Sequence, residues 1–319
     1  MSRIFEPEYM AERNRTYSLQ EVEEAIDNGD ILESMAVSCT EDKTVMLSIG
    51  DGITGRITFE DIEFRIDGLE TKPISAISRV GRHVKYIPIS IKNIEEGKYE
   101  VECSRKIAQE ICYDEYISKL IPGDIIDAKV VKIERYGVFC DIGCGIVALL
   151  PTNYISVTHI VDPRDALSTI KKLKVVVRQI QDDGKIQLTH KELLGTWDEE
   201  VSKFKEGQTV CGAVISIKDY GIFVRISQNL SGLANIPGDI EVKPGDIVSV
   251  HISSITRENM KVKLNIIDKI SDNSEQLSFK YYVEGPHIDK WVYTSKDSKS
   301  NKRQIETDFT LFMDMEGLR

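Results

Sequence analysis

The sequence predicts a mainly β protein made of small tandem barrels joined by short helices, and three observations lead to this fold class. A strand pattern that begins at Val130 returns at Val214, 84 residues later. Each copy continues into further short apolar strands separated by glycine turns, giving five strands in about 70 residues, which is typical of a small closed barrel. With 319 residues the chain has room for about two or three domains, and a repeat of this length fits tandem modules better than a solenoid.

The segments before and between the two clear copies complete this organisation. Near the N-terminus, Ser18 and Glu21 have the spacing of a helix capping box, and Gly29 is suited to end that helix. A weaker third copy of the strand pattern follows over residues 30–106. Apolar residues at helical spacing from Ile107 to Leu120 predict a helix between the first two barrels, and a similar segment precedes the third.

The C-terminal region departs from the barrel pattern. Aromatic residues on both sides of Gly285 and Pro286 predict a β-hairpin, and a polar tail follows it. The expected domains are an N-terminal helical extension, a first degenerate barrel, a linker helix, a second barrel, another linker helix, a third barrel, and the C-terminal hairpin with its tail. In that order they span residues 1–29, 30–106, 107–119, 120–191, 192–204, 205–268 and 269–319.

Composition places the chain among soluble globular proteins. It is 41% hydrophobic and 29% charged, which excludes collagen-like, fully disordered and disulfide-scaffold classes. The start lacks the basic-then-apolar layout of a secretory signal, and no apolar run reaches the roughly 18 residues of a membrane span. We therefore expect a cytoplasmic protein with no membrane partner. The six cysteines are sparse and include no C-x-x-C pair, so we expect reduced thiols and no metal site.

Motifs for catalysis are weak. Residues 50–55 match the glycine pattern of dinucleotide-binding proteins, but a strand pattern follows where a pyrophosphate site needs a helix, so a tight turn is the better interpretation. The chain has no phosphate-binding loop, serine-hydrolase elbow or zinc-protease motif, and its five histidines are scattered. We therefore expect no enzyme activity, no catalytic residue, no cofactor and no metal ligand.

A binding function has stronger support. In each later barrel a tyrosine and a phenylalanine stand at the start of the second strand, Tyr136 with Phe139 and Tyr220 with Phe223. Exposed rings on a small barrel can stack on bases, at roughly 1–3 kcal/mol each, while nearby cations contact phosphates. Spacing alone equally allows these rings to be core aromatics. Under the binding interpretation, the cationic candidates are Lys132, Arg135, Arg178, Lys185, Lys218, Arg225, Arg257, Lys261 and Lys263.

At these residues the two later barrels resemble the S-one RNA-binding repeat, an oligonucleotide-binding-fold module. The resemblance rests on the run from Tyr136 to Gly143 after a glycine turn, and on the matching run from Tyr220. It covers roughly residues 30–268. Three such repeats joined by short helices are similar to the short Gram-positive form of the bacterial small-subunit ribosomal protein S-one. The resemblance implies three five-stranded oligonucleotide-binding-fold barrels and an RNA-binding function.

The resemblance also implies particular site residues. In the family, two aromatics, a histidine, an aspartate and an arginine form the RNA face. The aromatics map to the two Tyr–Phe pairs, whereas the histidine position holds Pro151 in the second barrel and Asn235 in the third. The aspartate position holds Gln181 in the second barrel, and the arginine position holds Lys185 there and Lys261 in the third barrel.

The first barrel departs furthest from the family pattern. Its two aromatic positions hold Lys43 and Met46, so we expect it to bind RNA poorly and to dock to the ribosome or another protein instead. Residues 1–118 carry 14 Lys and Arg against 24 Asp and Glu, a net charge of −10, whereas residues 119–194 carry 11 against 9, a net charge of +2. Most of the total charge of −11 therefore lies in the part of the chain that contains the first barrel. It argues against RNA binding by the first barrel, but it does not argue against RNA binding by the second barrel.

The leading expectation is a non-catalytic single-stranded RNA-binding protein that helps to deliver mRNA to the small ribosomal subunit. Such a protein would act by stacking and phosphate contacts, with little sequence preference. The alternative is a protein-interaction scaffold that docks to the ribosome or to an RNA-degrading enzyme and binds RNA only incidentally. RNA binding by the purified protein alone distinguishes the two.

Overall fold

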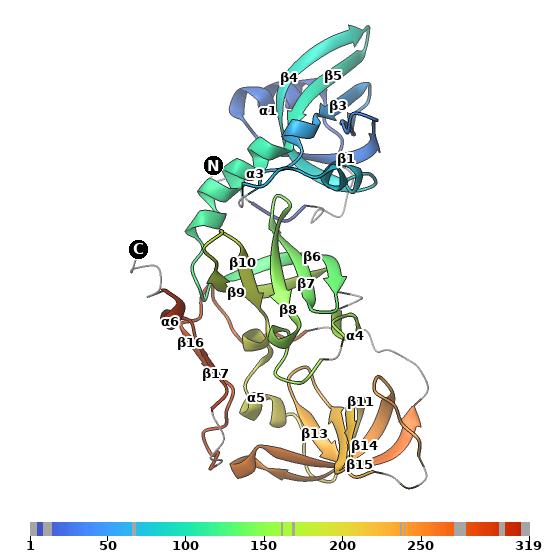
Figure 1. Cartoon of the computed structure of the whole chain (residues 1–319), viewed down its shortest axis with the longest axis vertical. Helices are drawn as coiled ribbons and strands as arrows, with labels where there is room; N and C mark the ends of the chain where they lie inside the picture. Colours follow the sequence, from blue (N-terminus) through green and yellow to red (C-terminus); the bar gives the residue numbers. More distant parts are fainter. Residues whose placement is uncertain are drawn as a thin grey trace.

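Three small barrels form a column in the computed structural model, in chain order from one end to the other (Figure 1). The C-terminal segment runs from the third barrel back alongside the second. The predicted mainly β fold class is confirmed. The structure describes residues 5–8, 15–65, 68–160, 162–167, 170–236, 238, 240–270, 279–299 and 304–313.

The first barrel follows the predicted N-terminal helix. Helix α1 spans Leu19–Asn28, with Ser18 and Glu21 forming the capping box and Gly29 ending the helix at φ 64°. The strands then close into a barrel in the order β1–β2–β3–β5–β4, with β3 parallel to β5. Their bounds are β1 Leu32–Cys39, β2 Val45–Gly50, β3 Ile53–Ile57, β4 His83–Glu95 and β5 Lys98–Ser104.

The second and third barrels repeat this strand order. In each, the third strand pairs in parallel with the fifth and the other neighbours are antiparallel, which is the oligonucleotide-binding fold. The second barrel contains β6 Ile125–Glu134, β7 Gly137–Gly143, β8 Ile146–Pro151, β9 Lys172–Ile180 and β10 Ile186–Thr189. The third contains β11 Thr209–Lys218, β12 Gly221–Arg225, β13 Ser231–Ala234, β14 Ile247–Thr256 and β15 Lys261–Ile270.

Each barrel closes around its own core because apolar residues alternate with outward-facing residues along the strands. On β2, the buried positions are Val45, Leu47 and Ile49. On β12, Ile222 and Val224 are buried in the same way. The residues between these buried positions face outward and form the surface on which a ligand can lie.

Short helices fill the connections between strands and barrels. Helix α3 begins at Arg105, directly after β5, where the Ser104 hydroxyl accepts a hydrogen bond from the Ile107 N–H, and it ends at Glu115. The other helices are α2 Pro73–Ile77, α4 Arg164–Leu167, α5 Trp197–Val201 and α6 Thr310–Met313, with 3-10 turns η1 Phe59–Asp61, η2 Ile117–Lys119, η3 Thr152–Tyr154, η4 Lys191–Leu194 and η5 Arg257–Asn259.

In the part of the chain that the structure describes, no helix has both the length and the apolar character needed to cross a membrane.

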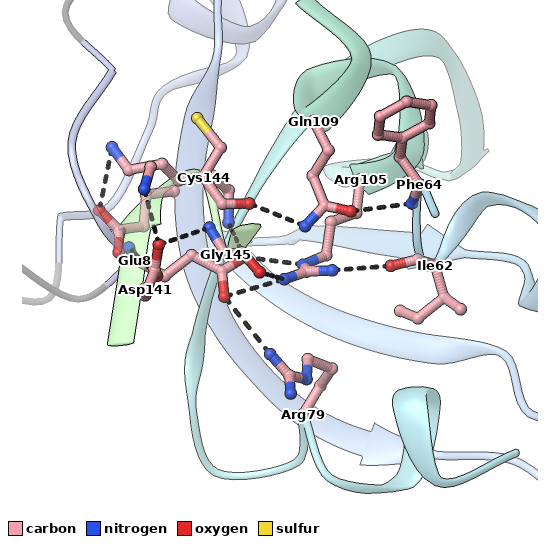
Figure 2. A network of polar contacts seen from close by, with 12 residues as sticks. Glu8, Ile62, Phe64, Arg79, Arg105, Gln109, Asp141, Cys144 and Gly145 are labelled. Carbon is pink, nitrogen blue, oxygen red and sulfur yellow. Dashed lines mark hydrogen bonds and ion pairs between the residues drawn. The ribbon is translucent and has the colours of Figure 1, made fainter. Parts of the chain in front are cut away.

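A buried polar network joins the first barrel to the second (Figure 2). Arg105 of α3 donates two hydrogen bonds to the Glu8 carboxylate, at 2.7 and 3.1 Å, and the Glu8 N–H donates to Asp141 of β7 at 2.8 Å. Burial acts to raise the pKa of Glu8, but the charge and hydrogen bonds of Arg105, with the charge of Arg79 and the Lys85 backbone N–H, lower that pKa overall. Burial and the charge of Glu8 raise the pKa of Asp141 to about 7. The network therefore holds three chain segments together by charge-assisted bonds.

A second buried contact joins the second barrel to the third through Asn229. Its amide oxygen accepts the Val157 N–H at 2.8 Å, and its amide nitrogen donates to the Gly195 carbonyl at 2.8 Å. The Tyr293 hydroxyl donates to the backbone carbonyl of Asn229 at 2.6 Å. One asparagine therefore links the second barrel, the connection to the third barrel and the C-terminal segment.

The C-terminal region contains a two-stranded antiparallel sheet, but the hairpin predicted around Gly285 and Pro286 is wrong in its position. The sheet pairs β16 Lys290–Val292 with β17 Glu306–Asp308. The predicted turn instead lies against the second barrel, where the Pro286 carbonyl accepts the Ile125 N–H at 2.7 Å. Backbone groups used in this way are not free to pair within a hairpin. The predicted polar tail falls partly on residues 300–303 and 314–319, outside the described residues.

Candidate nucleic-acid interface

The turn between β6 and β7 presents the first Tyr–Phe pair. The hairpin closes with a two-residue turn, Arg135 and Tyr136, and the Tyr136 side chain is 61% exposed. Phe139 lies on β7 between two buried residues, so its half-buried ring faces outward. The two ring centroids are 6.1 Å apart and the planes meet at 89°. This is the edge-to-face contact that aromatic pairs favour, and it leaves ring faces open to a ligand.

The third barrel repeats the arrangement. Asp219 and Tyr220 form the two-residue turn between β11 and β12, and Tyr220 is 68% exposed. Its ring lies 6.2 Å from the ring of Phe223, again at 89°. None of the four rings belongs to the buried core of its barrel. The interpretation of these residues as core aromatics is therefore wrong.

The glycine after each tyrosine lets the third strand approach closely. A Cβ atom added to Gly137 would lie 2.7 Å from the Leu150 carbonyl oxygen and 3.1 Å from Cδ1 of Leu149. Gly221 meets the equivalent strand at 2.7 Å in the third barrel. A side chain at either position would push the strands apart. Packing therefore requires a glycine directly after the tyrosine, and the same turn exposes the tyrosine ring.

The Phe139 ring belongs to a row of outward-facing side chains that crosses all five strands, and we call this row the outer row. Residues paired in register across a sheet share a face, so the strand pairing defines its members. In the order first, second, third, fifth and fourth strand, the outer row is Lys132, Phe139, Leu149, Gln187 and Gln179 in the second barrel. It is Ser216, Phe223, Leu233, Lys263 and Ser254 in the third, and Ser38, Met46, Arg56, Glu102 and Ser90 in the first.

The first barrel carries no aromatic ring on its outer row. Met46 occupies the position of Phe139, and Lys43, at φ 67°, stands in the turn between β1 and β2. Arg56, the next residue of the row, forms an ion pair with Glu100 at 3.8 Å. This surface therefore offers no ring for base stacking, and it places carboxylates where an RNA backbone would carry negative charge.

Cations flank the Tyr–Phe pair of the second barrel. Lys132 lies beside Phe139 on the outer row, and its ammonium is 2.6 Å from Glu134, whose hydrogen bond raises the pKa of Lys132. Arg135 is exposed in the turn itself. Lys185, between β9 and β10, forms an ion pair with Asp183 at 2.5 Å. Exposed pairs of this kind are weak, so a phosphate can take the place of either carboxylate.

Arg178 lies away from the outer row. Its guanidinium carbon is 4.2 Å from the ring centroid of Tyr154 and 4.9 Å from that of Phe312. Its Nε atom is buried and has no hydrogen-bond partner within the described structure. Arg178 of β9 therefore stacks on Tyr154 of η3 and Phe312 of α6, in a packing position that the sequence pattern did not reveal.

Three of the polar candidates in the third barrel are exposed. Lys218 ends β11 directly before the turn, and Asn235 follows β13. Lys261 begins β15 and shares a face with Lys263, because strand residues two apart point to the same side.

The two arginines of the third barrel are more constrained. Arg225 is half-buried at the end of β12. Arg257 forms an ion pair with Asp198 of α5 at 3.2 Å. Neither is a member of the outer row.

The described residues bring no three His, Cys, Asp or Glu side chains together in a group that could hold a metal ion. All six cysteines lie in the described part of the chain, and each is a free thiol.

Comparison with known proteins finds relatives of parts of this chain. Residues 119–191, which include the whole second barrel, match the S1 RNA binding domain. The chain is 29% identical over 223 residues to small ribosomal subunit protein bS1 of Staphylococcus aureus strain COL, a match that covers 64% of this chain and 56% of the relative. The same protein of Staphylococcus epidermidis is 29% identical over 196 residues, which cover 56% of this chain and 50% of the relative. The chain thus spans about half the length of the curated relatives it matches.

Among solved structures, a multidomain protein with nucleic acid binding domains from Streptococcus pneumoniae aligns with this chain at 14% identity and a TM-score of 0.24. The alignment covers 75% of this chain and 73% of the Streptococcus pneumoniae chain. The family match covers the second barrel, and its S1 RNA binding domain is the S-one repeat that the sequence resembles.

Proposed function

We propose that this protein binds single-stranded RNA without catalysing a reaction, and that it acts in translation by engaging mRNA at the small ribosomal subunit. The observation that carries the proposal is the Tyr–Phe pair that the second and third barrels both expose, with the same edge-to-face geometry. An exposed aromatic pair on an oligonucleotide-binding-fold barrel is suited to stacking on unpaired bases. The S1 RNA binding domain match at residues 119–191 supports the same substrate class.

The mechanism combines two contributions that different residues supply. Each tyrosine and phenylalanine presents a ring face, and stacking tolerates any base because every base has a π face. Exposed lysines and arginines near the rings supply phosphate contacts, which release counterions and make affinity fall as salt rises. Lys132 and Arg135 fill this role in the second barrel, and Lys218 and Lys261 in the third.

The translational role rests on the relatives. Proteins named small ribosomal subunit protein bS1 share 29% identity with about two thirds of this chain. With the support of this likeness, we propose that the protein is cytoplasmic and has mRNA and the small ribosomal subunit as partners. Co-sedimentation with small subunits in an mRNA-dependent manner is the expected behaviour, and sedimentation free of ribosomal particles contradicts this part of the proposal.

The RNA-binding proposal is tested by replacing one aromatic pair. The double change Tyr136→Ala and Phe139→Ala should weaken binding of a fluorescent single-stranded RNA at least tenfold, because two stacking platforms of roughly 1–3 kcal/mol each are lost. Ile94→Ala is the matched control, since Ile94 is an exposed apolar residue of the first barrel. Equal affinity of the ring variant and the control in an anisotropy titration would overturn the stacking mechanism.

A protein-binding role for the first barrel is the second candidate function. Several of its exposed residues are apolar and lie close together in the chain, on α2 and just after it, at Ile74, Ile77 and Val80. The Gly81 N–H donates to the Ala36 carbonyl, which brings this segment to the edge of β1. With the net charge of −10 over residues 1–118, this surface suits a protein partner better than RNA. Failure of the purified chain to bind RNA would favour this candidate.

A further inference from the structure

Two of the six cysteines contact each other at the junction between the first and second barrels. Cys112 lies on α3, the helix between these barrels, and Cys144 lies in the turn between β7 and β8. Both side chains are buried, and the two thiols share a hydrogen bond. We call these two residues the thiol pair. Two thiols in contact can be joined by a single two-electron oxidation.

The way in which α3 packs on the β7–β8 turn brings the thiol pair together. Arg105, Gln109 and Cys112 are spaced four and three residues apart, so they share one face of the helix. The Arg105 guanidinium donates to the Gly145 carbonyl at 3.5 Å, and the Gln109 amide donates to the Cys144 carbonyl at 3.0 Å (Figure 2). One face of α3 therefore contacts the turn at three successive positions, and the third contact is the thiol pair.

The turn itself is closely packed around the Cys112 sulfur. A Cβ atom added to Gly143 would lie 3.0 Å from the Cys112 Sγ atom and 3.6 Å from Cδ1 of Tyr116. Cys144 has a φ of 47°, in the left-handed region that non-glycine residues rarely adopt. Its N–H donates to the Glu6 carbonyl at 3.0 Å, which helps to hold it there. The surroundings thus fix both members of the thiol pair.

The same helix is also bonded to the first barrel. The Arg105 guanidinium donates to the Ile62 carbonyl at 3.0 Å, and the Gln109 amide oxygen accepts the Phe64 N–H at 2.9 Å. Because these side chains contact the β7–β8 turn as well, α3 connects the two barrels through bonds that can break and re-form. A covalent bond within the thiol pair would add a connection at the same place that thermal motion does not break.

The other four cysteines are placed differently. Cys103 and Cys140 are buried in the cores of their own barrels, and each thiol donates to a backbone carbonyl of its own strand, at 3.5 and 3.9 Å. Cys211 is exposed and Cys39 is half-buried. Contact between two thiols from different elements therefore distinguishes the thiol pair.

We propose that the thiol pair is a redox-sensitive modification site, at which an oxidant of the peroxide class forms a disulfide that locks the first barrel to the second. One thiol reacts with hydrogen peroxide to give a sulfenic acid and a water molecule, and the other thiol attacks that sulfur and releases a second water molecule. The two sulfurs lose two electrons and two protons, and the O–O bond of the peroxide is reduced. This site does not depend on RNA binding.

The environment of the thiol pair keeps it reduced until the oxidant persists. The hydrogen bond with Cys144, together with burial, raises the pKa of the Cys112 thiol far above its ordinary range. Because the thiolate is the form that attacks a peroxide, the thiol pair should oxidise more slowly than the exposed thiol of Cys211. The site therefore responds to sustained oxidation rather than to a brief exposure.

The test uses the full chain without its two more accessible thiols. Cys39→Ser combined with Cys211→Ser leaves four of the six cysteines. After prolonged treatment with hydrogen peroxide and removal of the oxidant, the number of free thiols measured in denaturant should fall from four to two. Peptide mapping without reductant should find Cys112 linked to Cys144, and dithiothreitol should restore all four thiols. No link, or links shared among other cysteines, would overturn the site.

Two further variants in this background identify the reacting thiols. Cys112→Ala should keep all three of its remaining thiols after oxidation, because the partner of Cys144 is gone. Cys140→Ala is the matched control, since it removes a buried thiol of the same barrel that lies outside the thiol pair, and its count should fall from three to one. Equal loss of thiols in both variants would overturn the assignment. The peptide map of the four-thiol chain holds even if either variant does not fold.

Thermal unfolding tests whether the disulfide locks the junction. Oxidation should raise the unfolding midpoint of the four-thiol chain by about 5–10 °C, because the new bond restricts the unfolded chain, and dithiothreitol should reverse the rise. The Cys140→Ala control should show the same rise and Cys112→Ala should show none. A disulfide that forms between Cys112 and Cys144 without raising the midpoint would overturn the locking role.

Discussion

At the scale of single residues, Tyr136 and Tyr220 are large rings exposed to water at the turn between the first two strands of their barrels. Each keeps one edge-to-face contact with a phenylalanine three residues later, so the ring is oriented but not buried. An oriented ring loses little conformational freedom when a base stacks on it, which favours binding. The first barrel lacks this arrangement because Met46 replaces the phenylalanine.

His190 is the residue whose environment makes the clearest prediction about pH. It is buried between the rings of Phe279 and Tyr281, at centroid distances of 4.6 and 5.7 Å. Burial lowers the pKa of His190 to about 4, although its Nδ1 atom contacts the Ile155 carbonyl at 3.0 Å. The C-terminal segment therefore packs against a neutral imidazole.

The pH dependence follows from this pKa. The unfolded chain binds a proton at His190 near pH 6.5, whereas the folded chain does so only near pH 4, so between these values acid favours the unfolded chain. The stabilisation is present above pH 6.5 and is lost as pH falls toward 4, by on the order of 3 kcal/mol. Urea unfolding of the unchanged chain and of His190→Gln should show a larger acid loss in the unchanged chain. Parallel losses in the two proteins would show that His190 does not carry the effect.

Some residues of the candidate site could be predicted from the sequence because their signal is local. The spacing of tyrosine, glycine and phenylalanine lies within one hairpin, so it identified both aromatic pairs. Arg178 could not be placed, because Tyr154 and Phe312, which stack on it, lie far from it in the chain. Leu149 and Gln187 were missed for the same reason, since parallel pairing of β8 with β10 sets their place on the outer row.

At the scale of secondary-structure elements, the hairpin of the first and second strands carries the proposed binding site. Its two-residue turn is possible because glycine follows the tyrosine and lets the third strand approach. The same strand order in all three barrels keeps the outer row in one place. The hairpin therefore determines where the rings lie, and the residues in its turn and on its second strand determine whether rings are present.

Gly137→Ala tests this dependence on the hairpin. The added Cβ would lie 2.7 Å from the Leu150 carbonyl, so β7 must move away from β8 and the Tyr136 ring moves with it. We expect a loss of about 1–3 kcal/mol of stability and weaker RNA binding, measured by thermal unfolding and anisotropy. Gly238→Ala is the control, because among the described residues no atom beyond its chain neighbours lies within 4 Å of a Cβ there. A Gly137→Ala protein as stable and as tight-binding as that control contradicts the account.

The C-terminal hairpin shows where element prediction failed. The aromatic run before Gly285 has the composition of a strand, but its backbone groups bond to other parts of the molecule. The Tyr282 N–H donates to Leu193, and Ile288 donates to Gly123. Such partners are remote in sequence, so no local pattern could distinguish this docked segment from a hairpin arm.

At the scale of the whole molecule, the barrels are joined by buried polar contacts rather than by linkers alone. Glu8 and Arg105 tie the first barrel to the second, and Asn229 ties the second to the third (Figure 2 shows the first of these junctions). The C-terminal segment adds bonds to both later barrels, including the one from Tyr293 to Asn229. The two aromatic pairs therefore sit on barrels whose junction is fixed by direct contacts.

Asn229→Ala tests the junction between the second and third barrels. The change removes an amide that accepts the Val157 N–H and donates to Gly195, and it leaves those buried groups unpaired at about 1–3 kcal/mol each. We expect urea unfolding of the two later barrels to separate into distinct transitions. Asn93→Ala, at an exposed position on β4, should leave the unfolding curve unchanged. A single unaltered transition in Asn229→Ala would mean that the junction does not couple the barrels.

The most direct test of the central claim removes all four rings at once, by changing Tyr136, Phe139, Tyr220 and Phe223 to alanine in the full chain. Titration of a single-stranded RNA at fixed salt should show affinity at least a hundredfold weaker than that of the unchanged chain, because each barrel loses at least tenfold. The residual binding should disappear as salt rises, since only phosphate contacts remain. Affinity within twofold of the unchanged chain, in a variant that keeps its thermal stability, would contradict RNA binding by aromatic stacking.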